Sequence, residues 1–189
     1  MIIYDKIVLS NFKKQYTMKK ITLFFILFII ITACGNEPKK EVEAEIITTY
    51  YLIRHAEKDR SNPSDRDPAL SEEGLKRAQN WNTYFKDVDF DMVYSTDYKR
   101  TKQTAQPIAK RIGKEISIYD PKNMASDEFM TATKGKTVLV VGHSNTTPVL
   151  ANKLAGENKY EMIADNNNSN LYIITLNDSG ILSELKVVN

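Results

Sequence analysis

The chain has 189 residues, which suggests one domain that is long enough to bury a sizeable core. Its formal net charge of +2 is nearly balanced, and its basic residues form no clustered patch, which excludes a nucleic-acid footprint. The single cysteine, Cys34, excludes an intrachain disulfide framework. We expect a monomer that has no nucleic-acid partner.

The N-terminal segment carries a targeting pattern. Lys19-Lys20 is a basic start, an apolar run follows from Ile21 to Thr32, and small residues then lead to Cys34. This order is typical of a secretory signal. The apolar run is shorter than the roughly 20 residues that a bilayer-spanning helix needs. Ile31-Thr32-Ala33-Cys34 also resembles a bacterial lipobox, which implies that the cysteine is lipidated and becomes the mature N-terminus.

We therefore expect three regions in the chain. Residues 1–34 would be an upstream extension followed by a lipoprotein signal peptide that begins near Met18, residues 35–45 a tether, and residues 46–189 the folded domain. A lipid on Cys34 would hold the protein on a membrane of the bacterial cell envelope, outside the cytoplasm. The alternative is a buried core helix with an incidental cysteine.

From residue 46 onward, the residue patterns alternate between strands and helices. The predicted strands are 46–53, 92–94, 116–119, 138–141, 171–176 and 181–188. The predicted helices are 72–85, 97–112, 121–133 and 147–154. Residues 177–180 are a hairpin signal between the last two strands. This order predicts an α/β fold, a three-layer α/β/α sandwich with a mostly parallel mixed sheet and a C-terminal hairpin.

Local signals predict where the helices begin and end. Capping residues are expected at three helix starts: Ser71 for the first helix, Thr96 or Asp97 for the second, and Ser144 or Asn145 for the last. Gly113 is a natural stop for the second helix, and Pro107 should kink or split it.

Each of the two histidines of the chain follows a strand-like run. Arg54-His55 follows the first strand, and His143 follows the fourth strand after Gly142. Ligands bind at the carboxyl ends of strands in open α/β sheets, so the two histidines are predicted to share one pocket. An arginine fork binds phosphate oxygens, and a neutral imidazole acts as a nucleophile or a base. The alternatives are a surface Arg-His pair and a satisfied core histidine.

Two further observations bear on the chemistry of this pocket. Arg100 begins the helix after the second strand and is predicted to reach the same strand ends. A zinc site made from the two histidines with Glu57 and Asp120 is the competing interpretation. The chain has no paired-histidine motif, and an arginine next to a cation would repel it, so phosphate chemistry is preferred.

Four segments occur in a family-specific order between residues 50 and 154. They are Arg54-His55-Ala56-Glu57, the D-x-x-L-S-x-x-G segment at 67–74, the R-x-x-Q-T-A segment that follows Tyr94-Ser95-Thr96, and Gly142-His143-Ser144. Together they resemble the histidine phosphatase superfamily, also called phosphoglycerate-mutase-like. In length, the domain is similar to the short phosphohistidine-phosphatase type of that family.

The resemblance implies a role for each matching residue. His55 would attack phosphorus and form a phosphohistidine, which water would then hydrolyse. Arg54 and Arg100 would hold the phosphoryl oxygens, and His143 would add a further donor. Ser144 and Asn145 are candidates for substrate binding because a helix N-terminus favours an anion. The resemblance implies neither a metal nor an organic cofactor.

The chain departs from the family pattern at the acidic proton donor. Asp120 is the candidate acid, with Asp127, Glu128 and Glu57 as further possibilities, and none of them lies in a recognisable motif. The insertions of mutase members are absent, which favours a phosphatase.

We therefore predict hydrolysis of a phosphomonoester in a lipid-anchored protein outside the cytoplasm. The substrate would be a phosphorylated small molecule or an envelope phosphomonoester. The alternative function is a catalytically silent module of the cell envelope that binds a phosphorylated ligand.

Overall fold

The computed structural model describes residues 44–188, so Cys34, the predicted signal peptide and most of the predicted tether lie outside the described residues. The strands are β1 (Thr48–Arg54), β2 (Met92–Ser95), β3 (Ile116–Ile118), β4 (Thr137–Gly142), β5 (Asn170–Asn177) and β6 (Gly180–Val187). The helices are α2 (Glu72–Tyr84), α3 (Lys99–Ile112), the 3-10 turn η1 (Pro121–Asn123), α4 (Asp127–Thr133) and α5 (Thr146–Ala155). None of the described helices is both long and apolar enough to cross a membrane.

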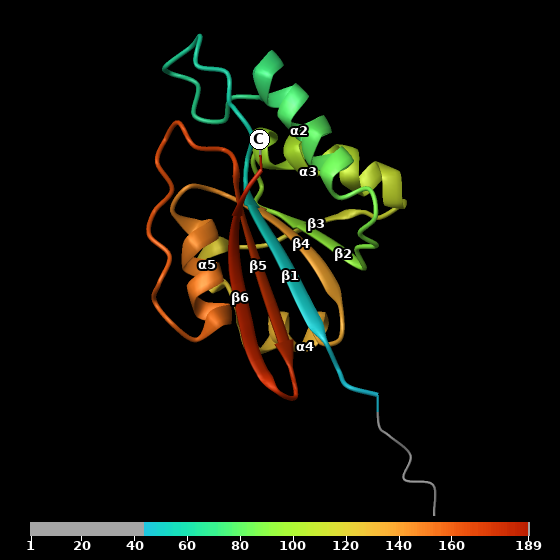
Figure 1. Ribbon diagram of the computed structural model, residues 1–189. Helices are drawn as coiled ribbons and strands as arrows, with labels where there is room; N and C mark the ends of the chain where they lie inside the picture. The colour runs from blue at the N-terminus through green and yellow to red at the C-terminus, as the bar shows by residue number, and fades with distance from the viewer. Residues whose placement is uncertain (1–43, 189) are drawn as a thin grey trace, which may run out of the picture. The chain divides into compact units, whose positions relative to one another are not determined.

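The strands form one mixed sheet in the order β3-β2-β4-β1-β5-β6 (Figure 1). The four strands from β3 to β1 pair in parallel, whereas β5 and β6 complete the sheet as an antiparallel hairpin. The predicted α/β class, mostly parallel sheet and C-terminal hairpin are confirmed. Strands β4 and β1 lie at the centre, with Arg54 in register with Gly142. The two predicted histidine positions are therefore neighbours at one end of the sheet.

Helices cover both faces of the sheet, as the alternation of buried side chains requires. On one face, Tyr50 and Leu52 of β1 pack in a buried cluster with Leu150 of α5. On the other face, Ile53 packs with Trp81 of α2 and Ile108 of α3. Figure 1 shows α2 and α3 together on one side of the sheet, apart from α4 and α5. The three-layer prediction is confirmed.

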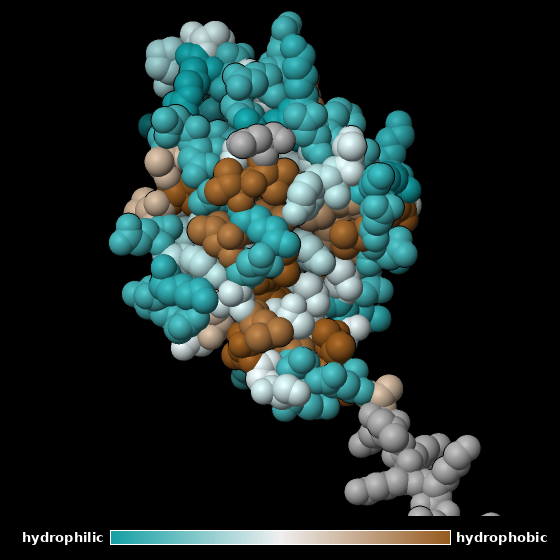
Figure 2. Space-filling view, viewed as in Figure 1, coloured by the Kyte–Doolittle hydropathy of each residue, from teal (hydrophilic) through white to brown (hydrophobic). Residues whose placement is uncertain are grey.

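The last strand presents a different surface. Strand β6 forms an edge of the sheet and is exposed along nearly its whole length. Apolar side chains gather on the surface over this edge (Figure 2). They are Ile181, Leu182, Leu185 and Val187.

Two predicted element boundaries are wrong, and one predicted break is absent. Strand β1 begins at Thr48 rather than at Ile46, and Ile46 stays exposed. The predicted helix at 121–133 is divided into η1 and α4, because Ala125 between them adopts a positive φ of 54°. Pro107 does not split α3, which continues from Lys99 to Ile112.

The predicted caps have mixed outcomes. Ser71 caps α2 and accepts a hydrogen bond from the Gly74 amide, as predicted. Neither Thr96 nor Asp97 caps α3, since Asp97 pairs with Lys102 and Tyr98 occupies the N-cap position. Instead, the Lys99 amide in the first turn donates to Asp67 Oδ1 from a distant segment.

At the start of α5 the predicted position is right but the predicted bond is missing. Asn145 is the N-cap residue of this helix, yet its side chain makes no capping hydrogen bond.

Candidate active site

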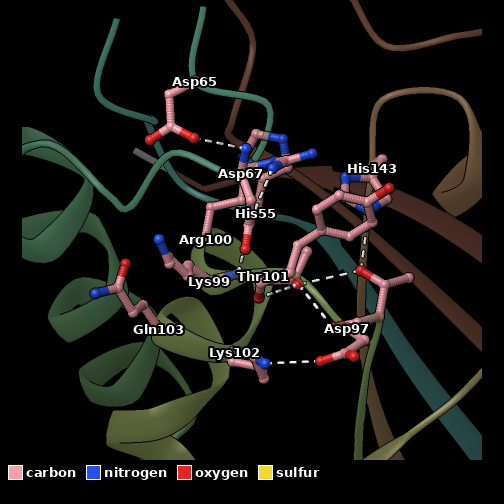
Figure 3. Close-up of polar contacts among 12 residues, drawn as sticks. His55, Asp65, Asp67, Asp97, Lys99, Arg100, Thr101, Lys102, Gln103 and His143 are labelled. Carbon is pink, nitrogen blue, oxygen red and sulfur yellow. Dashed lines mark hydrogen bonds and ion pairs between the residues drawn. The ribbon is translucent and has the colours of Figure 1, made fainter. Parts of the chain in front are cut away.

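The carboxyl ends of the parallel strands open into a pocket of about 490 Å³. His55, Arg100 and His143 lie together at this end of the sheet (Figure 3). The residues that line the pocket are Arg54, His55, Lys58, Tyr98, Arg100, Pro121, Lys122, His143, Ser144, Asn145, Thr146 and Asp165. The structure therefore brings together both predicted histidines, both predicted arginines and the two candidate substrate-binding residues.

His55 is held in a fixed orientation by its own backbone segment. The residue is 5% exposed, and its amide donates to the Gly142 carbonyl at 2.9 Å. Its Nδ1 lies 2.7 Å from the Ala56 carbonyl oxygen. A carbonyl oxygen only accepts, so Nδ1 carries the proton and Nε2 keeps its lone pair. Burial, with the positive charge of Arg54 and Arg100 nearby, lowers the pKa of His55 to about 3, so the ring is neutral.

Arg54 lines the pocket and is held by the loop before β5. Its Nη1 donates to the carbonyl oxygens of Ala164, Asp165 and Asn167 at 2.8, 3.0 and 2.9 Å. Its Nη2 donates to Asp165 Oδ1 at 3.1 Å. Its Nε is buried and has no hydrogen-bond partner among the described residues. An unpartnered buried N–H is costly in a folded protein, which makes this group a candidate for binding an anion.

Arg100 supplies further unpartnered donors. Its guanidinium carbon lies 4.4 Å from the centre of the Tyr98 ring, and its Nη1 lies 3.5 Å from Asp67 Oδ1. That separation is too long for a charge-assisted hydrogen bond. Within residues 44–188, Arg100 Nε and Nη1 are both buried without a hydrogen-bond partner. The two arginines thus hold three buried donors that a phosphoryl group could satisfy.

His143 is oriented by a side chain of the neighbouring strand end. Its ring lies 5.5 Å from the His55 ring, and its Nε2 lies 2.9 Å from Thr96 Oγ1. The Thr96 hydroxyl in turn contacts the Thr101 hydroxyl at 3.1 Å. Burial, with Arg100, Arg54 and Lys58 adding positive charge, lowers the pKa of His143 to about 4. The ring is therefore neutral at physiological pH.

The structure explains the other motif residues by the contacts they make around His55. Gly74 of α2 packs directly on the backbone after β1, and a Cβ there would lie 2.0 Å from the Glu57 carbonyl oxygen. Thr104 Oγ1 accepts from the Ala56 amide at 2.9 Å, and Gln103 Oε1 accepts from the Leu70 amide at 2.8 Å. These motif positions hold the segment that carries His55 against α2 and α3.

The predicted acid, Asp120, does not line the pocket. Its carboxylate caps η1 by accepting from the Lys122 amide at 2.9 Å, and it borders a separate hollow of about 250 Å³. Glu57 pairs with Arg77 at 2.6 Å. Among the lining residues, Asp165 is the one carboxylate. Sequence reasoning missed it because its loop meets Arg54 only through the tertiary fold.

Sequence reasoning also missed several partners of the site. Thr96 was predicted only as a cap, and Tyr98 carried no signal. Lys58 and Lys122 belong to the segments 58–67 and 120–133, which the sequence predicts to rim the pocket, but it assigns neither lysine a role. Concerning the zinc alternative, no three His, Cys, Asp or Glu side chains within residues 44–188 cluster so as to hold a metal ion.

Comparison with known proteins relates this fold to histidine phosphatases. Residues 50–121 match the family model of the histidine phosphatase superfamily (branch 1). The predicted resemblance to this superfamily is confirmed; the match contains three of the four motif segments, and Gly142-His143-Ser144 lies outside it. No curated relative matches the chain at a significant level.

Solved structures share the fold at low sequence identity. The protein histidine phosphatase SixA complexed with tungstate is 17% identical, with a TM-score of 0.61 over 74% of this chain and 96% of that chain. The mycobacterial glucosyl-3-phosphoglycerate phosphatase is 14% identical, with a TM-score of 0.54 over 76% and 99%. A phosphoserine phosphatase mutant from Entamoeba histolytica is 16% identical, with a TM-score of 0.56 over 72% and 94%.

Proposed function

We propose that the chain hydrolyses phosphomonoesters through a phosphohistidine intermediate on His55. The proposal is carried by two arginines that line the pocket, Arg54 and Arg100, whose buried donors have no partner among the described residues, beside a neutral imidazole with a free Nε2. The donors would bind the phosphoryl oxygens and stabilise the charge that spreads over them in the transition state. The neutral ring would supply the nucleophile.

The reaction has two steps on this arrangement. In the first, the lone pair of His55 Nε2 forms a bond to phosphorus while the bond to the leaving oxygen breaks. In the second, water attacks the phosphohistidine, the P–N bond breaks, and inorganic phosphate leaves. His143, 5.5 Å from His55 between ring centres, would contact the phosphoryl group. The two guanidinium groups supply the positive charge, so the proposal needs no metal ion.

The leaving oxygen needs a proton unless it departs as a stable anion. Asp165, the carboxylate of the pocket, is paired with Arg54 at 3.1 Å and with Arg60 at 2.7 Å. A carboxylate held by two guanidinium groups is a weak proton donor. We propose that water supplies the proton, and p-nitrophenyl phosphate, whose leaving group departs as an anion, is therefore the substrate for the first test.

The test uses the full-length chain purified in detergent. We expect turnover of p-nitrophenyl phosphate in the presence of EDTA and an acid-labile, base-stable phosphoenzyme in rapidly quenched samples. An enzyme that turned over only with added divalent metal would contradict the metal-independent reaction. A chain that bound orthovanadate but gave neither turnover nor phosphoenzyme would be a silent binding module, an alternative that the pairing of Asp165 with two arginines favours, because it leaves no free acid among the pocket-lining residues.

We further propose that the chain acts outside the cytoplasm, held to a membrane by a lipid on Cys34. The proposal is supported by the sequence from Lys19 to Cys34, which lies outside the described residues. In a bacterial host, Cys34→Ser should move the protein from the membrane fraction to the soluble fraction. Unchanged membrane retention would overturn the lipid anchor and leave the phosphatase proposal intact.

A further inference from the structure

Two lysines line the pocket, and the hydrolysis proposed above does not use either of them. Lys58 follows the His55 segment and is half-buried, whereas Lys122 is exposed in η1, after β3. The two lysine side chains thus come from two different segments of the chain. Lys58 also lines an adjoining cavity of about 370 Å³ that shares Arg54, His55 and Asp165 with the main pocket.

Neither lysine has a charged partner within residues 44–188. Both arginines of the pocket face a carboxylate, Arg54 that of Asp165 and Arg100 that of Asp67. Among the described residues, Lys58 and Lys122 form no ion pair. Two uncompensated cations on one concave surface raise the local concentration of anions and favour their binding.

The charge of Lys58 extends to the reacting end of the pocket. Its ammonium group is one of the positive charges that lower the pKa of His143. The pocket of about 490 Å³ also lies within the roughly 300–1,000 Å³ that holds a whole small molecule. A phosphoryl group bound at His55 would leave most of this volume for the rest of the substrate.

We propose that the substrate is a phosphomonoester whose leaving group carries a second anionic group, and that Lys58 and Lys122 bind this second anion. The inference rests on the proposed function, because it takes the phosphoryl group to lie at His55. Lysine is a compact point charge without the bidentate geometry of arginine, so a carboxylate and a second phosphate are both accepted. The inferred substrate class is thus a small phosphate ester with at least three negative charges.

The experiment compares two aryl phosphates that differ only in this charge. They are 4-carboxyphenyl phosphate and its methyl ester, and the measured quantity is the ratio of their kcat/KM values for the full-length chain. We expect the wild type to prefer the acid. Lys58→Met and Lys122→Met should each reduce this preference about tenfold, the effect of losing a hydrogen bond to a charged group.

Two matched variants control the result. Lys58→Arg keeps the charge and should keep the preference for the acid. Lys110→Met removes an exposed lysine in the last turn of α3, outside the pocket, and should keep the wild-type ratio. A wild type with no preference, or lysine variants that lose activity equally on acid and ester, would overturn the inference.

A binding measurement separates this inference from the proposed hydrolysis. The phosphonate 4-carboxybenzylphosphonate and its methyl ester cannot be hydrolysed by the proposed reaction, and calorimetry gives their Kd values directly. If neither aryl phosphate were turned over, hydrolysis would fail, but tighter binding of the acidic phosphonate, lost in Lys58→Met, would still support the anion subsite. Equal affinity for the two phosphonates would reject it.

Discussion

Strands β1 and β4 lie side by side and each delivers one histidine to the same pocket, yet the two histidines are held in different ways. His55 is fixed by the backbone around it, through the Ala56 carbonyl and the pairing of its amide with Gly142. His143 is fixed by the hydroxyl of Thr96, which comes from the end of β2. The first arrangement is local to the strand end, whereas the second depends on the packing of another strand.

This difference separates the roles of the two rings. A backbone carbonyl at Nδ1 leaves the Nε2 lone pair of His55 free, as a nucleophile needs. In His143 it is Nε2 that is occupied, by a hydroxyl whose own partner is Thr101. Equivalent positions at two strand ends therefore carry a proposed nucleophile and a proposed binding partner. Three experiments test whether the two rings differ in this way.

Replacing each histidine separately should have the largest effect. His55→Ala should lower kcat/KM for p-nitrophenyl phosphate by at least about 10⁴-fold and abolish the phosphoenzyme, because it removes the nucleophile. His143→Ala removes the second ring proposed to contact the phosphoryl group and should lower kcat by about 10²- to 10³-fold, with phosphoenzyme still formed. Stopped-flow and quench measurements test both. Phosphoenzyme in His55→Ala would show that the two rings have been assigned the wrong roles.

The pH dependence of stability should give the next largest effect. The folded-state pKa values of about 3 for His55 and about 4 for His143 lie below the usual 6.5. The unfolded chain therefore binds protons first, and each histidine removes stability as the pH falls from about 6.5 towards its folded pKa. At pH 4.5 we expect a loss of roughly 2 kcal/mol per histidine relative to pH 7.

Urea unfolding of wild type, His55→Asn and His143→Asn at the two pH values measures this loss. Each variant should show a smaller fall in the free energy of unfolding than the wild type. Identical pH dependence in all three proteins would mean that neither ring is buried in its neutral form.

Removing the hydroxyl that orients His143 should give the smallest effect. Thr96→Val should lower kcat for p-nitrophenyl phosphate about tenfold. This is the lower end of the loss of activity that follows when a side chain that orients a functional histidine is removed. Thr96→Ser keeps the hydroxyl and should retain most of the activity. The His55 phosphoenzyme should form in both variants, since the Ala56 carbonyl still orients that ring. A loss of phosphoenzyme in Thr96→Val alone would mean that the two strand ends are not independent.

The sequence was sufficient to predict the central features of the site. Arg54, His55 and His143 follow strand-like runs, and the carboxyl ends of parallel strands meet at one edge of the sheet. Arg100 was predicted for the same reason, from its place just after β2. These positions depend on the order of the elements, which hydrophobic periodicity indicates well.

The remaining parts of the site depend on contacts between distant segments. Thr96 was expected to cap α3, but its hydroxyl contacts His143 and Thr101 instead, and Asp67 reaches the first turn of that helix. Asp120 was the candidate acid, yet its carboxylate is satisfied two residues away in η1. Short polar side chains have several possible partners, and only tertiary packing selects one of them.

The bonds of Arg54 to the loop before β5 have a thermodynamic consequence. One guanidinium group holds the backbone at Ala164, Asp165 and Asn167, and the same side chain lines the pocket. An anion that competes for this group with Asp165 changes how firmly the loop is held. By reciprocity, any condition that loosens the loop changes the affinity for the anion by the same factor. The order of residues 164–167 and the occupancy of the pocket are therefore coupled through Arg54. Measuring either one reports on the same coupling free energy.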